Sequence, residues 1–185
     1  MRRLLSAFAV LLLSCVCSFA QKWSVGTNLV DYVNVGTLNL EAGVGVGQHL
    51  SLTAQARYNP WMFRYGTADQ FQNKKQSYAV GLRWWPWHVF SGWWFSAEGQ
   101  YQEYNRGGFV FGSTAEEGDA AGLVLSGGYT LMLHKFLNVE FGAGIWGGRK
   151  WYTEYACTRC GRIMDSGSSW FFLPDELKVS LVFIF

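Results

Sequence analysis

The residues with the clearest chemical potential are two cysteines close together near the end of the chain. Cys157 and Cys160 enclose Thr158 and Arg159. In an exported protein such a pair forms a disulfide by default, and we expect one here that stiffens its loop. A zinc site would need further Cys or His ligands beside them. A redox role would need a thioredoxin-like context, which the flanking sequence lacks.

The three histidines, His49, His88 and His134, are the next candidates. Lipid-modifying enzymes of small membrane barrels generally use a His, often beside Ser or Asp. All three histidines lie in or beside short polar turns, away from the long connections where such a site would be expected. We therefore expect no catalytic residues, no cofactor and no metal, with a lipid-modifying enzyme as the alternative.

The segment from Gly142 to Gly147 matches the pattern GxGxxG. A dinucleotide site would need a strand that turns into a helix there, with an acidic residue about 20 positions further on. Here the glycines alternate with Ala143 and Ile145, as in a single strand. We interpret the match as accidental.

Residues 1–20 have the features of a signal peptide, which leaves 21–185 as one domain. Arg2 and Arg3 precede an apolar run that ends in Ser18-Phe19-Ala20. Their removal lowers the formal net charge from +2 to 0, so no basic field remains to attract nucleic acid. A lipidated Cys15 is an alternative, although Leu13 fits a lipobox poorly.

The elements that must position any site are strands, because apolar and polar residues alternate through most of the chain. No stretch after the signal peptide reaches the roughly 20 apolar residues of a membrane-spanning helix. Eight segments show the alternation: 23–29, 38–46, 50–58, 78–84, 93–102, 121–131, 137–145 and 177–185. Short and long connections alternate between them, with long ones at 59–76, 105–119 and 149–174, as in outer-membrane barrels.

The position of the glycines decides which face of these strands points outward. Glycines such as Gly43, Gly81 and Gly142 share the polar face, where they would relieve crowding inside a narrow barrel. We therefore predict an all-β, eight-stranded antiparallel transmembrane up-and-down barrel, polar inside and apolar outside. Trp84, Trp85, Trp87, Trp93 and Trp94 would form an aromatic girdle at one membrane interface. The alternative is a soluble barrel with an aromatic core.

Charged residues of the polar face would then lie in the lumen, where they must be paired. The predicted lumenal ion network contains Glu41, Arg57, Arg83, Glu98, Glu140 and Lys178. Neighbouring strands suggest the pairs Glu41 with Arg57, Arg83 with Glu98, and Glu140 with Lys178. A barrel of eight strands is just wide enough for its own side chains, so a solute pore is not expected, and a minor channel is the alternative.

The long connections carry both positive and negative residues, and this mixture does not indicate which kind of ligand they bind. Their aromatic residues, Phe109, Phe111, Tyr152, Tyr155 and Trp170, could contact a glycan, a lipid headgroup or a protein.

The last strand resembles the closing strand of bacterial outer-membrane barrels. Leu181, Phe183 and the terminal Phe185 share its apolar face, and this resemblance implies a signal for the barrel-assembly machinery. The segments 26–29, 39–52, 78–85 and 137–140 together with this strand resemble an uncharacterised family of small OmpA-like outer-membrane barrels from the Bacteroidota. The resemblance implies a location in the outer membrane of a Gram-negative bacterium, among outer-membrane lipids. It supplies no catalytic residues, so we expect a surface interaction or envelope-structural protein that acts through its external loops.

Overall fold

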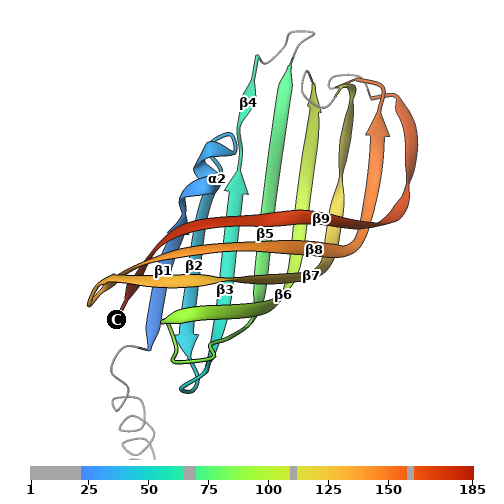
Figure 1. Ribbon diagram of the computed structural model, residues 1–185. Coiled ribbons are helices and arrows are strands. Elements are labelled where there is room, and N and C mark those ends of the chain that lie inside the picture. Colours follow the sequence, from blue (N-terminus) through green and yellow to red (C-terminus); the bar gives the residue numbers. More distant parts are fainter. Residues whose placement is uncertain (1–21, 65–69, 109–111, 158–160) are drawn as a thin grey trace, which may run out of the picture.

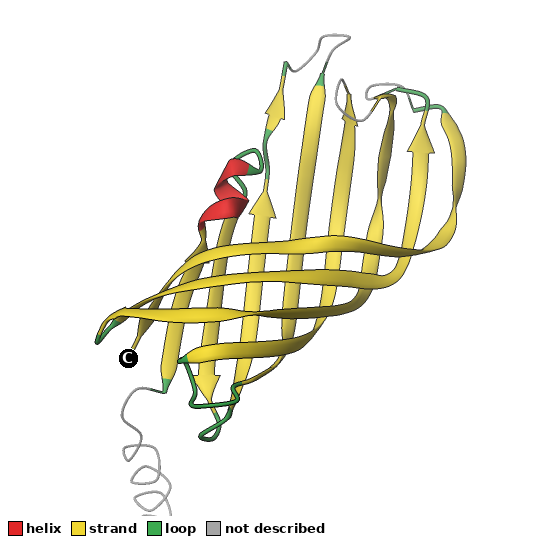
Figure 2. Cartoon of the chain, viewed as in Figure 1, coloured by secondary structure: helices red, strands yellow, loops and turns green. Residues whose placement is uncertain are grey.

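The computed structural model describes residues 22–64, 70–108, 112–157 and 161–185. Figure 1 shows long strands that wrap around a common axis, and Figure 2 shows that strand makes up nearly all of the described chain, with one short helix. No helix among the described residues is long and apolar enough to cross a membrane.

Nine strands form one antiparallel sheet, and eight of them close into a barrel. The order is β3-β2-β1-β9-β8-β7-β6-β5-β4, and a further pairing of β3 with β5 closes the ring. The strands are β1 Trp23–Asn28, β2 Leu38–Gly45, β3 Leu50–Asn59, β4 Met62–Phe63, β5 Phe71–Trp84, β6 Gly92–Gly108, β7 Gly112–His134, β8 Leu137–Tyr155 and β9 Ile163–Ile184. The predicted eight-stranded antiparallel barrel is therefore confirmed, and β4 is an additional short strand beside β5.

A short helix, α2 Leu29–Val33, occupies the connection between β1 and β2, where the sequence suggested only a brief turn. Its N-cap is Asn28, whose side chain accepts a hydrogen bond from the amide of Val30, as Asn commonly does at this position. The same side chain bonds the backbone of Leu177 and Val179 in β9. Asn28 therefore ends β1, starts the helix and ties both to the last strand.

The later strands are much longer than their alternating segments predicted. The connections expected at 105–119 and 149–174 are largely strand, because β6 pairs with β7 up to Gly108 and β8 pairs with β9 up to Tyr155. Beyond the barrel, the ends of β5 to β9 form a sheet extension that rises above α2 (Figure 1). The prediction of long loops was wrong here because β6 and β7 carry polar residues on both faces of the extension, which removes the alternation.

The side chains of the barrel are arranged inside out compared with a soluble protein. Leu40, Val80 and Leu123 point outward and are 56–63% exposed, whereas Arg83, Glu140 and Lys178 are at most 3% exposed. Consecutive residues of a strand face opposite sides, so this contrast confirms the predicted polar interior and apolar exterior.

The predicted aromatic girdle is only partly correct. Trp84, Trp87 and Trp93 are more than half exposed, but Trp85 and Trp94 are fully buried. Trp94 fits because Gly128 and Gly142 face it, where an added Cβ would lie 2.5–2.8 Å from the indole ring. Alternation in β6 places Trp94 on the same inner face as Ser96 and Glu98, so the girdle prediction should not have included it, whereas Trp85 lies just beyond the end of β5.

Candidate functional site

Four charged side chains meet in the middle of the lumen. Arg83 of β5 donates to Glu41 of β2 at 2.9 Å and to Glu140 of β8 at 3.1 Å. Lys178 of β9 bonds Glu41 and lies 3.8 Å from Glu140. The Arg83 guanidinium also lies 4.3 Å from the centre of the Trp94 ring. The cluster therefore joins opposite walls of the barrel.

The structure changes the pairing that the sequence suggested. Glu140 and Lys178, on neighbouring strands, do lie together. Glu41, however, binds Arg83 and Lys178 and does not pair with Arg57, so that prediction was wrong. Arg57 instead contacts Asp31 of α2 and Asp175 of β9, each at 3.2 Å. Long side chains reach across a narrow lumen, so neighbouring strands do not decide the partner.

Glu98, the remaining residue of the predicted network, is buried and accepts a hydrogen bond from Thr53. Thr130 similarly donates to Glu140, and Ser96 and Ser126 share a hydrogen bond. The inner wall is therefore a polar core in which buried acids have hydroxyl donors as well as cations.

Apolar side chains fill the lumen on either side of this ion cluster. At the end with the short turns, Trp85, Phe90 and Trp94 pack with Val182 and Ile184, and Trp85 donates to Ser51. Towards the extension, Val124 and Trp146 pack with Ala120, Tyr104 and Phe171. The lumen is thus occupied at three successive levels.

The other residues singled out from the sequence have these positions. Cys157 is disulfide-bonded, while Cys160 lies outside the described residues. His49 and His88 lie in the short connections and His134 ends β7. The GxGxxG segment lies entirely within β8, so it does not open a helix. Phe183 and Phe185 are exposed on the outer face at the end of the chain. No group of three or more potential metal ligands occurs in the described part of the chain.

The inner face of the sheet extension has its own compact network around Glu116. This carboxylate accepts hydrogen bonds from Tyr104 at 2.6 Å, Lys150 at 2.9 Å and Arg106 at 3.0 Å. Burial raises the pKa of Glu116, but the three hydrogen bonds outweigh it and lower the pKa to about 2. Burial and the bond to Glu116 raise the pKa of Tyr104. The charge of Glu116 is therefore compensated by cations of the same face.

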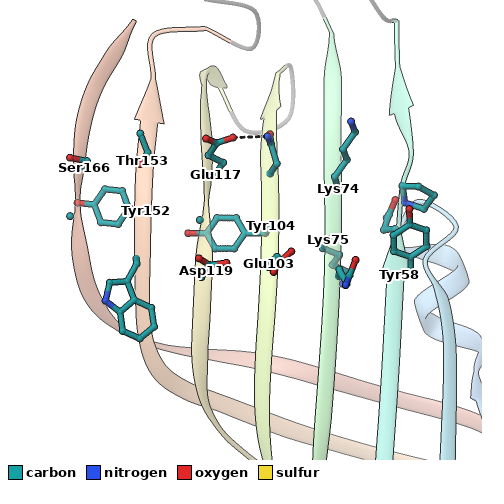
Figure 3. A pocket seen from close by; sticks show the side chains of 17 residues that line it. Tyr58, Lys74, Lys75, Glu103, Tyr104, Glu117, Asp119, Tyr152, Thr153 and Ser166 are labelled. Atoms are coloured by element: carbon teal, nitrogen blue, oxygen red, sulfur yellow. Dashed lines mark hydrogen bonds between the residues drawn. The ribbon is translucent and has the colours of Figure 1, made fainter. Parts of the chain in front are cut away.

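A groove of about 790 Å³ crosses the extension from β9 to β5 and reaches the end of β3. Its centre follows one cross-strand row, formed by Lys75, Tyr104, Gly118, Tyr152 and Gly167. The residues on both sides of this row line the groove, and their side chains share the outward face with Tyr78 and Tyr101. They include Tyr58, Lys74, Gln76, Glu103, Asn105, Glu117, Asp119, Trp151, Thr153 and Ser166. Figure 3 shows these residues across the width of the sheet.

Three carboxylates of the groove lack cationic partners, in contrast to Glu116. Glu103 lies directly opposite Asp119 in the β6–β7 ladder, and the hydroxyl of Tyr101 donates to both. Glu117 accepts from Asn105 at 3.1 Å, which is the bond drawn in Figure 3, and from Tyr155 at 2.6 Å. The bond to Glu117 raises the pKa of Tyr155. No ion pair to any of the three occurs within the described residues.

Aromatic surface adjoins these acids at both ends of the groove. Trp151 is 46% exposed and Tyr58 is 50% exposed, and the Arg149 guanidinium lies 5.8 Å from the Trp151 ring centre. This site could not be recognised from the sequence, because Glu117 and Trp151 lie in two segments that were predicted to be separate loops. The register of the paired strands brings these two residues together, and no local sequence motif indicates that register.

A comparison with protein families identifies the family of this chain. Residues 6–185 match the model of a family described as a protein of unknown function, DUF3575. The chain belongs to this family. No curated protein and no solved structure matches it. The family and the barrel are therefore shown, and the activity must be inferred from the structure.

Proposed function

We propose that this chain is a closed barrel of the outer membrane of a Gram-negative bacterium, where it presents its sheet extension as a binding surface. The observation that carries the proposal is the reversed distribution of side chains. Soluble monomers rarely expose apolar patches beyond a few hundred Å². Here Leu, Val, Phe and Trp residues cover the outside, and ions occupy the inside.

A bilayer explains this distribution, because lipid replaces water around the apolar surface. A closed barrel also satisfies every strand's backbone within the hydrocarbon region. The resemblance to Bacteroidota barrels, the N-terminal signal sequence and the terminal Phe185 support export and insertion by the barrel-assembly machinery. Outer-membrane lipids are then the first partners.

The sheet extension supports a role in surface interaction. In β6 and β7, the residues beyond Tyr101 and Ala121 are mostly polar on both faces, which suits water rather than lipid. The three filled levels of the lumen favour a binding or envelope-structural role over a channel. The acidic and aromatic groove lies in this extension, at the end of the molecule opposite the short turns.

Cysteine labelling in membranes tests the proposal. Leu123 is 63% exposed and its neighbour Val124 is 2% exposed, so Leu123→Cys and Val124→Cys differ mainly in orientation. A lipid-soluble maleimide should modify Leu123→Cys and leave Val124→Cys unmodified. On intact cells, a membrane-impermeant maleimide should modify Ser168→Cys in the extension and not Leu123→Cys.

Fractionation and electrophoresis complete the test. The full chain with its N-terminal segment should sediment with the outer membrane and show the heat-dependent mobility of a folded barrel. Recovery as a soluble monomer without detergent would refute the proposal. So would modification of Leu123→Cys by the impermeant reagent alone.

A further inference from the structure

We propose that the groove of the sheet extension binds an uncharged saccharide, with Trp151 as the stacking platform. This inference rests on the proposed function and gives the binding surface a ligand class. The volume of about 790 Å³ lies within the range of small-molecule sites, ~300–1,000 Å³. The groove crosses several strands, so its shape suits an extended oligomer better than one compact molecule.

The side chains of the groove match the hydrogen-bonding needs of sugar hydroxyls. Each hydroxyl both donates and accepts, and carboxylates and amides offer paired groups for neighbouring hydroxyls. Glu103, Asp119 and Glu117 provide acceptors along β6 and β7, and Asn105 and Gln76 add amides. Lys74, Thr153 and Ser166 provide donors at the margins. Hydrogen-bond donors and acceptors are therefore both present along the groove.

The exposed ring of Trp151 provides the apolar contact that a polar groove needs for affinity. Its indole is 46% exposed, and the face of an aromatic ring is a large apolar surface. Tyr58 repeats this feature at the opposite end, where it is 50% exposed. Aromatic rings at the ends and polar groups between them suit a chain of pyranose rings.

The charges of the groove select against anionic saccharides. Glu103 and Asp119 face each other, an arrangement that destabilises a sheet, and Glu117 lies on the next diagonal. Among the described residues that line the groove, Lys74 is the only cation whose side chain shares the outward face with these acids. The three carboxylates would repel a phosphate, sulfate or uronate, whereas they would accept hydrogen bonds from the hydroxyls of a neutral sugar. The groove should therefore discriminate by charge.

The ligand could be a free oligosaccharide or the headgroup of a glycolipid in the same membrane. Glu103 and Gln76 lie one outward position beyond Tyr101 and Tyr78, which belong to the apolar exterior. The groove thus begins where the apolar surface ends, within reach of lipid-linked sugars. The shared chemistry is a neutral hexose chain.

Calorimetric titration of the refolded mature chain in a sugar-free detergent tests the proposal. The probes are maltohexaose, mannohexaose and galactohexaose, with hexagalacturonic acid as the anionic counterpart. We expect millimolar or tighter binding of at least one neutral hexamer and none of the acid. A parallel titration with vesicles containing monogalactosyl diacylglycerol separates the two sources. Binding to the vesicles alone identifies a glycolipid headgroup, and binding of a soluble hexamer identifies a free oligosaccharide.

Matched variants locate the site. Trp151→Ala should weaken binding about tenfold or more, as loss of about 1.4 kcal/mol would. Trp170→Ala is the control, because Trp170 is 80% exposed on β9 but does not line the groove, and should change affinity less than about twofold. The double variant Glu103→Gln, Asp119→Asn should allow the acidic hexamer to bind.

The outcomes separate this inference from the proposed function. Heat-dependent mobility in electrophoresis shows that each preparation is folded. A folded, membrane-located barrel that binds no neutral hexamer and no glycolipid vesicle would overturn the saccharide inference and leave the membrane assignment intact. Equal loss of binding in Trp151→Ala and Trp170→Ala would also overturn it. A chain that is soluble without detergent would instead refute the proposed function.

Discussion

At the scale of single residues, Lys178 shows how the lumen depends on balanced charge. Lys178 is 2% exposed, and its ammonium group contacts two carboxylates, Glu41 and Glu140. Arg83 binds the same two acids from the opposite wall. Two cations therefore serve two anions, and removal of one cation leaves a buried negative charge in excess.

We predict that Lys178→Met destabilises the barrel by about 3 kcal/mol, because breaking a buried ion pair leaves its partner uncompensated. Urea unfolding in lipid vesicles, followed by tryptophan fluorescence, measures the change. Lys135→Met, at an exposed position in the β7–β8 turn, should stay close to the wild type. Adding Glu41→Gln to Lys178→Met should restore part of the loss. If Lys178→Met is as stable as Lys135→Met, the ion cluster does not stabilise the fold.

The sequence was sufficient to place residues such as Lys178 inside the barrel, because strand alternation fixes the face of each side chain. It was not sufficient to identify their partners. Arg83 reaches Glu140 across the lumen, and this contact depends on barrel diameter and strand stagger. The same reason explains Arg57, whose partner Asp31 lies on a helix that alternation did not predict.

At the scale of elements, the sheet extension is the part that the sequence described least well. Alternation arises when one face meets an apolar environment and the other a polar one. In the extension, Tyr104, Arg106 and Glu116 lie on one face and Glu103, Asn105 and Glu117 on the other. With polar residues on both faces the signal is lost, although the pairing continues. The candidate groove lies in this region and was missed for the same reason.

Glu116 should stabilise the sheet extension without affecting the stability of the barrel. We predict that Glu116→Gln lowers the amide protection of β6, β7 and β8 beyond Gln102, Ala120 and Arg149, because Arg106 and Lys150 lose their anionic partner. Protection within the barrel should not change. Hydrogen exchange with mass spectrometry measures both regions. Glu154→Gln is the control: it makes the same chemical change at the residue directly opposite Glu116 in the β7–β8 ladder.

The dependence on pH follows from the same carboxylate. The pKa of Glu116 is lowered to about 2 in the folded protein, whereas an unperturbed Glu titrates near 4.3. Its stabilising contribution is therefore present above pH ~4.3 and is lost as the pH falls towards 2. Protection of the wild-type extension should decrease between these values, and Glu116→Gln should show less of this decrease. An identical pH response of the two proteins would exclude Glu116 as its source.

At the scale of the whole molecule, the lumen combines three different fillings in series. Trp85 and Phe90 close the end with the short turns, the Arg83 and Lys178 cluster closes the middle, and Trp146 with its neighbours closes the end below the extension. The two outer levels are apolar and aromatic packing, and the middle level is a cluster of ion pairs. An ion that crosses the barrel would have to pass all three.

We therefore predict that the refolded protein produces no conductance steps in planar lipid bilayers. The double variant Trp85→Ala, Phe90→Ala should also remain silent, because it opens one level and leaves the ion cluster and the Trp146 packing in place. Heat-dependent mobility of the same preparations shows that silence does not result from unfolding. Discrete steps from the wild type would contradict a closed lumen, while steps from the double variant alone would show that the aromatic end is the only barrier. Silence of both would exclude an open pore and would agree with the proposed role of the groove in the extension.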